Sequence, residues 1–516
     1  MAQGVLPFQY QEQSTHTGLT ALAGLPSYLD LAQASGLRDA IRTHLHLRGE
    51  GSQGWTDSQV VMALILLNLS GGDCVADIER LEADEGLCRV MQQVEHHGLP
   101  RRERRALERR WRKQRSRSFP SPSAIFRYLA AFHDPAQEAQ RQPHTAFIPQ
   151  DSEPLRALKR VNRDFVAFVQ SRSPQSQATL DMDATLVESQ KEQALWCYQK
   201  YRAYQPFNTY WAEQDLVLDS EFRDGNVPAG HQQLRLLQHA LEQLPEGVED
   251  VFVRSDTAGY QKDLLRYCAE GQSERFGVIE FAIGADVTES FRQAVREVPE
   301  EQWSPVVRTD ADGKEHPTGQ QWAEVCFVPS WAGHSKNGPA YRFVATRERL
   351  RQQFCLPGQD EVTEDQDHLE TPCGEHYKIR GIVTNRTLDG NELIAWYRQR
   401  CGKSEEVHAV MKEDLAGGKL PSGDFGENAA WWAIMILALN LNAAMKRLVL
   451  PQSWRRKRLK ALRFGLIHLA GQVRQRSRQL QILLSPRHPA LPLLLQVRER
   501  IAQLARGAPG GLIPAQ

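Results

Sequence analysis

Residues 178–187 have the sequence ATLDMDATLV, in which a short apolar run leads into two aspartates and a threonine. This pattern predicts a β-strand followed by a turn, with Asp183 at the end of the strand. Two or three adjacent strands, then a helix, then another strand indicate a mixed α/β layer. Further strands are predicted at residues 194–206, 210–222, 250–255, 276–283 and 377–384, and helices at residues 232–244, 263–270 and from 391 onward.

The charges of the chain are segregated, although the formal net charge of its 516 residues is zero. Residues 101–118 contain ten Arg or Lys, and residues 446–478 contain eleven and no acid. Residues 360–370 form an acidic cluster without a base. Two basic blocks and one acidic loop are typical of a polyanion-binding protein, and solvated helix faces are the alternative interpretation.

The regions around the α/β layer differ from it in pattern. Helical spacing and the adjacent basic block predict a helical DNA-binding region near the N-terminus, for which a helical subdomain packed on the core is the alternative. Residues 300–375 interrupt the layer with strand-like pieces and many turn residues. We therefore expect five segments: a helical DNA-binding region at 1–150, the first part of the core at 151–299, a mainly β insertion at 300–375, the second part of the core at 376–450, and a basic helical C-terminal region at 451–516.

The cysteines and the apolar runs point to the cytoplasm rather than to a membrane. The eight cysteines include no CxxC pair, so a zinc ribbon is not expected, and in a chain of this length they fit a reducing compartment. The N-terminus lacks the basic start and apolar run of a signal peptide. The longest apolar stretch, residues 429–439, is too short to span a bilayer and predicts a buried helix.

Three carboxylates are expected at the ends of these elements. Asp183 ends the first strand, Asp256 follows the strand at 250–255, and Glu405 lies in the helix after the strand at 377–384. Such carboxylates can converge on one cation site, and oxygen ligands of this kind suit Mg²⁺. Two such ions can activate an attacking hydroxyl and stabilise the leaving oxygen of a phosphodiester. Each acid taken singly has a simpler interpretation as a helix cap or an ion-pair partner.

Four stretches together resemble the DDE transposases of bacterial insertion sequences, and specifically insertion-sequence family thirteen-eighty. They are Asp-Met-Asp-Ala-Thr at 181–185, Arg-Asp-Gly-Asn at 223–226, Arg-Ser-Asp at 254–256 with Gly-Tyr close behind, and YRQRCGKSEEVHAVMK at 397–412. The last is similar to the Tyr-Arg-Glu-Lys signature of related transposases, with one extra residue between Arg400 and Glu405. The resemblance runs from about residue 18 to residue 505.

The resemblance implies an RNase H-like catalytic core whose Asp183, Asp256 and Glu405 hold two Mg²⁺ ions, with Mn²⁺ as the alternative metal. It implies an enzyme that cleaves double-stranded DNA at terminal inverted repeats and joins the ends to a target site. A homodimer on the DNA, in the bacterial cytoplasm near the nucleoid, is expected. The competing interpretations are a DNA-binding relic without catalysis and a stand-alone RNase H-like nuclease.

Two choices between neighbouring acids stay open. Asp181 and Asp183 share a strand face, and we prefer Asp183 because it occupies the Asp-x-Thr position. On a helix, Glu405 lies on the same side as Tyr397 and Lys412, whereas Glu406 points nearly the opposite way. A break at Gly402 would reverse this second preference.

Further DNA contacts follow from the resemblance. Arg400 and Lys412 would hold DNA phosphates beside the metal ions, and Tyr397 would lie with them. The expected insertion carries Trp303, Trp322 and Trp331. In related transposases that pass through a DNA hairpin, an aromatic residue of the insertion stacks on a flipped base. A core position is the alternative for Tyr397 and for each tryptophan.

Overall fold

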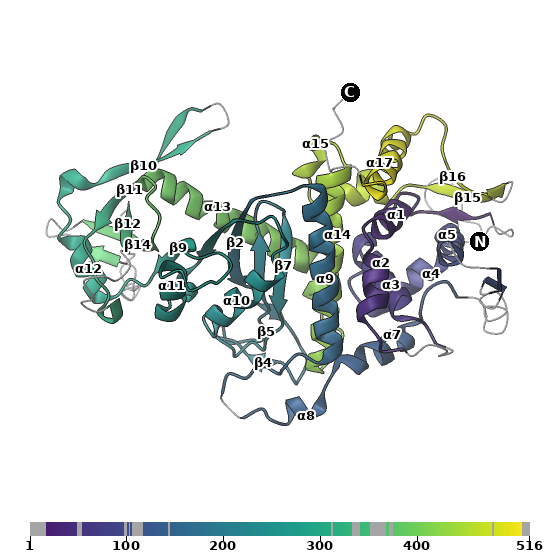
Figure 1. The fold of residues 1–516 in the computed structure, drawn as a ribbon, viewed down its shortest axis with the longest axis horizontal. Coiled ribbons are helices and arrows are strands. Elements are labelled where there is room, and N and C mark those ends of the chain that lie inside the picture. Colours follow the sequence, from purple (N-terminus) through teal and green to yellow (C-terminus); the bar gives the residue numbers. More distant parts are fainter. Residues whose placement is uncertain are drawn as a thin grey trace, which may run out of the picture. The chain divides into compact units, whose positions relative to one another are not determined.

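The chain folds into two compact units. One consists of residues 1–140, 149–173 and 410–516, and the other of residues 141–148 and 174–409. Figure 1 shows their helices and strands in a computed structural model. The structure describes residues 17–48, 54–97, 101–102, 104–105, 117–142, 145–310, 313–332, 341–350, 368–370, 375–476 and 479–507. The acidic cluster at 360–370 and the basic block at 101–118 lie mostly outside these residues.

The first unit is mainly helical. Its α-helices are α1 (Pro26–Ala34), α2 (Leu37–His44), α3 (Asp57–Ser70), α4 (Ile78–Ala83), α5 (Glu85–His96), α7 (Pro122–Leu129), α8 (Pro135–Glu138), α9 (Glu153–Arg172), α14 (Phe425–Ala444), α15 (Gln452–Arg455), α16 (Leu459–Leu462) and α17 (Ala490–Ala505). Its strands are β1 (Leu19–Thr20), β15 (Gly471–Arg476) and β16 (Gln479–Leu484), in the order β1-β15-β16.

Helix α14 is the core of this unit. The helix and the π-helical turn after it, together Phe425–Val449, are apolar and long enough to cross a membrane, but 78% of the most apolar window is buried inside the unit. Its polar side chains have partners in distant parts of the sequence: Tyr28 donates to Asn442 at 2.9 Å and Asn440 donates to Asn162 at 2.7 Å. The predicted buried helix is therefore confirmed, and it is longer than its apolar run.

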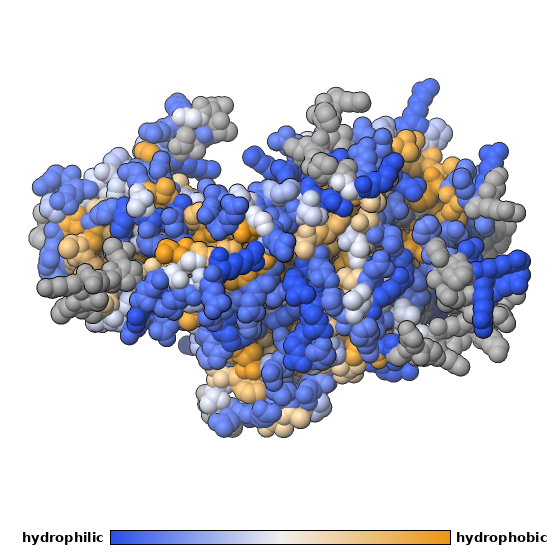
Figure 2. All heavy atoms as spheres, viewed as in Figure 1, coloured by the Kyte–Doolittle hydropathy of each residue, from blue (hydrophilic) through white to orange (hydrophobic). Residues whose placement is uncertain are grey.

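The ends of the chain pack together in the first unit, which differs from the boundaries expected at residues 150 and 451. Strand β1 pairs with β15, and helices α1 and α3 contact α17 and α14 respectively. The C-terminal region expected to be helical contains α15, α16 and α17, but residues 471–484 within it form the hairpin β15–β16. Residues of β16 alternate between exposed and half-buried, the period-two pattern of a strand. Leu483 of β16 and Leu495 of α17 are exposed. Figure 2 shows apolar surface over the region of α17.

The second unit is built on a ten-stranded mixed sheet with the order β10-β11-β12-β14-β9-β8-β2-β6-β7, in which β13 pairs with β14 off this path. Its strands are β2 (Gln177–Ala184), β6 (Phe207–Trp211), β7 (Leu216–Glu221), β8 (Asp250–Ser255), β9 (Glu280–Ala285), β10 (Ser304–Thr309), β11 (Glu315–Val325), β12 (Arg342–Arg349), β13 (His368–Glu370) and β14 (His376–Thr384). The α-helices are α10 (Gln233–Gln243), α11 (Lys262–Ala269), α12 (Glu289–Arg296) and α13 (Gly390–Ala409).

Strand β2 lies inside this sheet and has one parallel and one antiparallel neighbour. It is parallel to β8 on one side and antiparallel to β6 on the other, while β8 is parallel to β9. Helix α10 connects β7 to β8, and α11 connects β8 to β9. The carboxyl ends of β2 and β8 therefore lie at the same edge of the sheet. Asp183 is the penultimate residue of β2, and Asp256 directly follows β8.

The predicted insertion is mainly β in its described residues, and it continues the same sheet. Strands β10, β11 and β12 join the sheet through β14, which pairs with β12 on one side and β9 on the other. Buried apolar residues from both parts, among them Val306, Val344 and Ile382, form one cluster with Leu393 and Ile394 of α13. The insertion thus packs against the start of the helix that carries Glu405.

Helix α13 begins at a close contact with the insertion. A Cβ atom at Gly390 would lie 2.2 Å from the Trp322 ring, because the ring packs directly on the first turn. Gly402, twelve residues later, is exposed and has no atom within 4 Å of its Cβ position. The helix runs unbroken through Gly402, so the break that would reverse the preference for Glu405 is not observed.

Replacing these two glycines by alanine should have opposite effects on stability. Gly390→Ala forces Trp322 or the helix to shift and should destabilise the protein by about 1–3 kcal/mol. Gly402→Ala removes a flexible residue from an exposed helical position and should stabilise it by about 0.5–1 kcal/mol. Urea unfolding followed by circular dichroism measures both, and equal effects of the two substitutions would contradict the packing described.

Candidate active site

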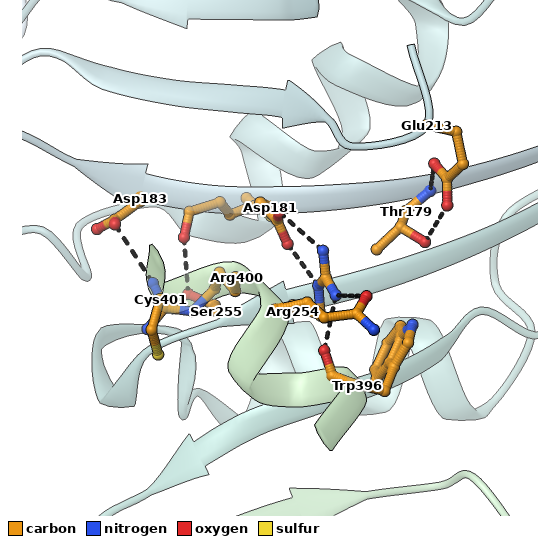
Figure 3. A network of polar contacts seen from close by, with 11 residues as sticks. Thr179, Asp181, Asp183, Glu213, Arg254, Ser255, Trp396, Arg400 and Cys401 are labelled. Carbon is orange, nitrogen blue, oxygen red and sulfur yellow. Dashed lines mark hydrogen bonds and ion pairs between the residues drawn. The ribbon is translucent and has the colours of Figure 1, made fainter. Parts of the chain in front are cut away.

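A buried ion pair lies beneath the edge where β2 and β8 end (Figure 3). Arg254 of β8 faces Asp181 of β2 and donates to both carboxylate oxygens, from Nε at 2.6 Å and from Nη2 at 2.9 Å. Its third nitrogen donates to the carbonyl oxygen of Trp396 in α13 at 2.7 Å. The Asp181 side chain is fully buried. Asp181 is thus the counter-ion of Arg254, and the pair ties together two strands and the helix.

Asp183 occupies a different environment, two residues further along β2. Its side chain is 22% exposed, and its contact with Arg400 of α13 is longer, at 3.3 Å from Nη1. Burial raises the pKa of Asp183 to about 6, which the charge of Arg400 opposes and the charge of Asp256 reinforces. A carboxylate that is partly desolvated and close to a second carboxylate is poised to bind a cation, because a cation relieves both effects.

Asp256 follows β8 and caps the short 3-10 helix Thr257–Gly259. Its carboxylate accepts from the backbone N–H of Ala258 at 3.1 Å, and the residue is half-buried. Asp256 is close enough to Asp183 for its charge to raise the pKa of that group. The two predicted aspartates are therefore brought together.

Glu405 and Glu406 are both exposed on α13, and their neighbours show which way each side of the helix faces. On the side of Glu406, Lys403 pairs with Asp215 in the β6–β7 turn at 2.6 Å. Burial, together with charges that include Asp215 and Glu406, raises the pKa of Tyr210. The β6–β7 turn lies beside the start of β2, away from Asp183, since Trp211 pairs with Leu180.

The opposite side of the helix faces the other end of β2. His408, which is close to Glu405 on the helix surface, lies 3.4 Å from Asn208, and Asn208 pairs with Asp183. The carboxylates of Asp183, Asp256 and Glu405 are nevertheless not all within 4.8 Å of one another among the described residues. The described residues therefore do not hold these three carboxylates together as a closed set of ligands.

One compact group of acidic and sulfur ligands does occur among the described residues, but it lies in the first unit. The ligand atoms of Asp73, Cys74 and Asp77 are within 4.8 Å of one another. Asp77 accepts from the backbone N–H groups of Asp73 and Cys74, at 3.1 and 3.3 Å, and Lys419 pairs with Asp73. This group is a capped turn whose hydrogen bonds explain its geometry, and it shares no residue with the predicted site.

Sequence comparison identifies the family. The profile described as "Transposase DDE domain group 1" matches residues 11–506, nearly the whole chain. The chain belongs to the DDE transposases. This protein is therefore a DNA-cleaving transposase, and members of its family use divalent metal ions. No curated protein matches significantly. Among solved structures, a piggyBac transposase synaptic complex with hairpin DNA is similar, with a TM-score of 0.40, 9% identity, and coverage of 97% of this chain and 89% of that one.

Tyr397 and Arg400 line the inner face of α13 in the transposase. Arg400 is buried and lies 5.8 Å from the centre of the Tyr397 ring, measured from its guanidinium carbon. Burial raises the pKa of Tyr397, whose hydroxyl lies beside Gly284 of β9. The Nε of Arg400 is buried without a hydrogen-bond partner among the described residues. Arg400 thus has an Nε–H donor, next to Asp183, that makes no hydrogen bond with the described residues.

Lys412 lies in the π-helical turn Val410–Asp414 that follows α13, within the first unit. A π-helical turn advances the chain by less than 100° per residue, so the angle between Glu405 and Lys412 differs from that of a regular helix. The predicted role of Lys412 in DNA binding stays a prediction.

The three tryptophans of the insertion differ in their surroundings. Trp303 is 7% exposed and stacks against the Arg347 guanidinium, 4.2 Å from its carbon. Trp322 packs on Gly390 and joins the buried cluster around α13. Trp331 is half-buried against Tyr341 and Tyr260. Trp303 is thus buried, whereas Trp322 and Trp331 are both partly exposed.

Sequence reasoning missed the role of Arg254. In the sequence, Arg254 stands out only as part of the Arg-Ser-Asp stretch. In the structure it donates hydrogen bonds to both carboxylate oxygens of Asp181, which distinguishes Asp181 from Asp183. The available signal was an arginine inside an otherwise apolar strand, since such a charge requires a buried partner.

Exchanging each aspartate of β2 for asparagine should separate their roles. Asp181→Asn leaves Arg254 buried with a neutral partner and should destabilise the transposase by about 3–5 kcal/mol. Asp183→Asn, in metal-free buffer at pH 7, should instead stabilise it by about 1–3 kcal/mol, because the wild-type pKa of about 6 lies above the ordinary 3.8.

The pH dependence gives the check on this prediction. A raised pKa means that the folded chain holds the proton more tightly than the unfolded chain. The contribution of Asp183 to stability is therefore greatest below about pH 4 and is lost as the pH rises through about 6. Thermal unfolding with a chelator at pH 5 and at pH 7.5 should show the advantage of Asp183→Asn growing with pH. An advantage that shrinks with pH would contradict it.

Proposed function

We propose that Asp183, Asp256 and Glu405 are the catalytic carboxylates of an RNase H-like core in this transposase. The strand order β7-β6-β2-β8-β9 supports such a core, because an antiparallel β2-β6-β7 meander followed by two parallel strands with helical connections is its arrangement. The observation that carries the proposal is the meeting of Asp183 and Asp256 at one sheet edge, under a helix that carries Glu405.

Two contrasts support these residues over their neighbours. Both oxygens of Asp181 accept hydrogen bonds from Arg254, whereas Asp183 is partly exposed and has only the longer contact with Arg400. Lys403 and Glu406 lie on the side of α13 that faces the β6–β7 turn, which leaves Glu405 on the side of the two aspartates.

The donor set fits Mg²⁺, with Mn²⁺ as the alternative. Carboxylate oxygens with partial exposure suit a hard cation that keeps several waters, and the raised pKa of Asp183 reflects the lack of a compensating positive charge strong enough to offset burial. Two bound ions would supply an activated hydroxyl and stabilise the leaving oxygen of the phosphodiester. Asp183, Asp256 and Glu405 would hold them.

The remaining residues of the site would position the DNA. Arg400 is fixed over Asp183 by its ion pair and keeps a buried Nε donor, so it is placed to hold a phosphate beside the carboxylates. Tyr397 packs against Arg400 and would fix its orientation. In this way the protein binds and orients the scissile phosphate before chemistry.

We further propose that the natural substrate is the terminal inverted repeats of an element of insertion-sequence family thirteen-eighty, bound by a homodimer in the bacterial cytoplasm. The four sequence stretches and the two basic blocks support this assignment. The presence of all three acids argues against a DNA-binding relic without catalysis. The basic blocks favour an enzyme that binds specific DNA ends over a stand-alone nuclease.

The catalytic assignment predicts which glutamate is essential. Glu405→Gln, Asp183→Ala and Asp256→Ala should each reduce Mg²⁺-dependent cleavage of repeat-end DNA by at least about a hundredfold, because each removes a proposed metal ligand. Glu406→Gln is the matched control, and it should keep substantial activity because the side chain faces the other way. Cleavage of labelled DNA at saturating enzyme measures all four.

Binding should survive these changes, since basic side chains carry most of the affinity for DNA. An inactive Glu406→Gln protein beside an active Glu405→Gln protein would show that the wrong glutamate was chosen. Full cleavage by the Asp256→Ala protein would contradict the assignment of all three catalytic carboxylates.

The N-terminal basic block predicts a salt-dependent contribution to binding of the repeat. Replacing Arg109, Arg110, Arg112 and Lys113 by Gln in the full-length chain should weaken binding and lower the slope of log affinity against log salt by up to about 4, at about 0.9 for each lost phosphate contact. Full-length protein is required because the N-terminal helices pack on α14 and α17. Gel shifts at several salt concentrations measure the slope, and an unchanged slope would exclude this block from the DNA interface.

A further inference from the structure

Between the first two strands of the catalytic sheet, the chain makes an excursion that exposes aromatic side chains. Strands β3 (Val187–Glu188), β4 (Leu195–Trp196) and β5 (Arg202–Tyr204) form a separate three-stranded sheet with the order β3-β5-β4 (Figure 1). At its outer hairpin, Trp196 is 62% exposed and Tyr198 is 74% exposed. Large aromatic rings left in water at the tip of an ordered hairpin indicate a binding surface.

The hairpin is held in one conformation by its own contacts. The N–H of Cys197 donates to Tyr201 at 2.9 Å, and Lys200 closes the turn in the left-handed region with φ of 64°. The amide of Gln199 accepts from the Tyr201 hydroxyl at 3.0 Å and donates to the Tyr198 hydroxyl at 3.2 Å. The exposed rings are therefore preorganised, which lowers the entropy lost when they bind.

The Arg-Asp-Gly-Asn stretch at 223–226, which the catalytic assignment leaves without a role, braces this hairpin from beneath. Gly225 donates its N–H to Ala203 at 2.9 Å, and a Cβ atom there would lie 2.5 Å from Ala203 O and 2.9 Å from Leu195 O. Arg223 is fully buried, pairs with Glu221 at 2.8 Å, and accepts the N–H of Gln205 on its carbonyl. The motif fixes the position of the hairpin rather than the chemistry of the carboxylates.

The neighbouring charges match a nucleic acid. Arg202 lies opposite Trp196 in the strand pair, with its guanidinium carbon 5.9 Å from the ring centre. Lys200 in the hairpin turn and Lys191 between β3 and β4 are exposed, and the exposed acids of this segment are Glu188 and Glu192. Rings that can stack on bases, next to cations that can hold phosphates, are the combination by which proteins bind unpaired nucleotides.

The hairpin and the carboxylates belong to the same unit and the same stretch of chain. Asn208 pairs with Asp183, and Arg202 precedes Asn208 by six residues. At about 3.3 Å per residue, the base of the aromatic surface lies within about 20 Å of Asp183 along the chain. That span corresponds to about six nucleotide steps of DNA, at 3.4 Å each.

We propose that Trp196 and Tyr198, supported by Lys200 and Arg202, form a stacking site for unpaired nucleotides of the DNA substrate within about six nucleotides of the cleavage point. The site rests on the proposed function, since it needs DNA bound at Asp183. It holds the strand beside the cut and so limits where the scissile phosphate lies.

The test compares two DNA ligands with the full-length transposase in Ca²⁺, which supports binding without cleavage in the assay. One ligand is a repeat-end duplex, and the other is the same duplex with six unpaired nucleotides next to the cleavage point. Trp196→Ala and Tyr198→Ala should each weaken binding of the second ligand by about 5- to 150-fold, the loss expected for one stacked base, and leave the first within about twofold. Trp196→Phe should retain most of the affinity, because it keeps a ring.

Val278→Ala is the matched control, since Val278 is 60% exposed elsewhere in the same unit. It should change neither affinity, and all variants should unfold at the wild-type temperature. Equal losses on both ligands, or no loss on either while the wild type binds and cleaves, would overturn the stacking site alone. A wild-type protein that neither binds nor cleaves repeat-end DNA would overturn the proposed function, and the stacking site with it.

Discussion

The arrangement of the catalytic unit depends on the buried ion pair between Asp181 and Arg254. A guanidinium group with this little exposure is stable only when its donors are satisfied, and here two go to Asp181 and one to the Trp396 carbonyl. The same group therefore fixes β2 against β8 and sets α13 across them. Once these three elements are fixed, Asp183, Asp256 and Arg400 must lie where they do.

This constraint gives the two aspartates of β2 opposite tasks. Burial raises the pKa of both carboxyl groups, but Asp181 is paired with Arg254 through both oxygens, while Asp183, two residues further on, has only a 3.3 Å contact with Arg400. The carboxylate with the weaker protein partner is the one suited to a cation. Two glycines permit close contacts elsewhere in this unit. Gly390 lets Trp322 pack on the start of α13, and Gly225 lets the 223–226 loop approach the aromatic hairpin.

Much of the local structure follows from the sequence. The strand at 250–255 has the predicted bounds, and α10, α11 and β14 agree with prediction to within one residue at each end. Their patterns are strong because buried strands are continuous apolar runs and the helices keep a 3.6-residue period. The C-terminal hairpin at 471–484 was missed, because β15 is mostly polar and its pairing partner β1 lies more than 400 residues away.

The sequence by itself determined the family, the order of strands and helices, and the three acids that resemble a catalytic set. These depend on residue type and local spacing, which are visible along the chain. The tertiary structure decided that Asp181 is a counter-ion, that Trp303 is buried while Trp322 packs against the core, that Lys403 of α13 pairs with the β6–β7 turn, and that an aromatic hairpin is braced by the 223–226 loop. Each of these depends on which side chain from a distant part of the sequence satisfies a buried charge or fills a contact, and spacing along the chain does not encode that choice.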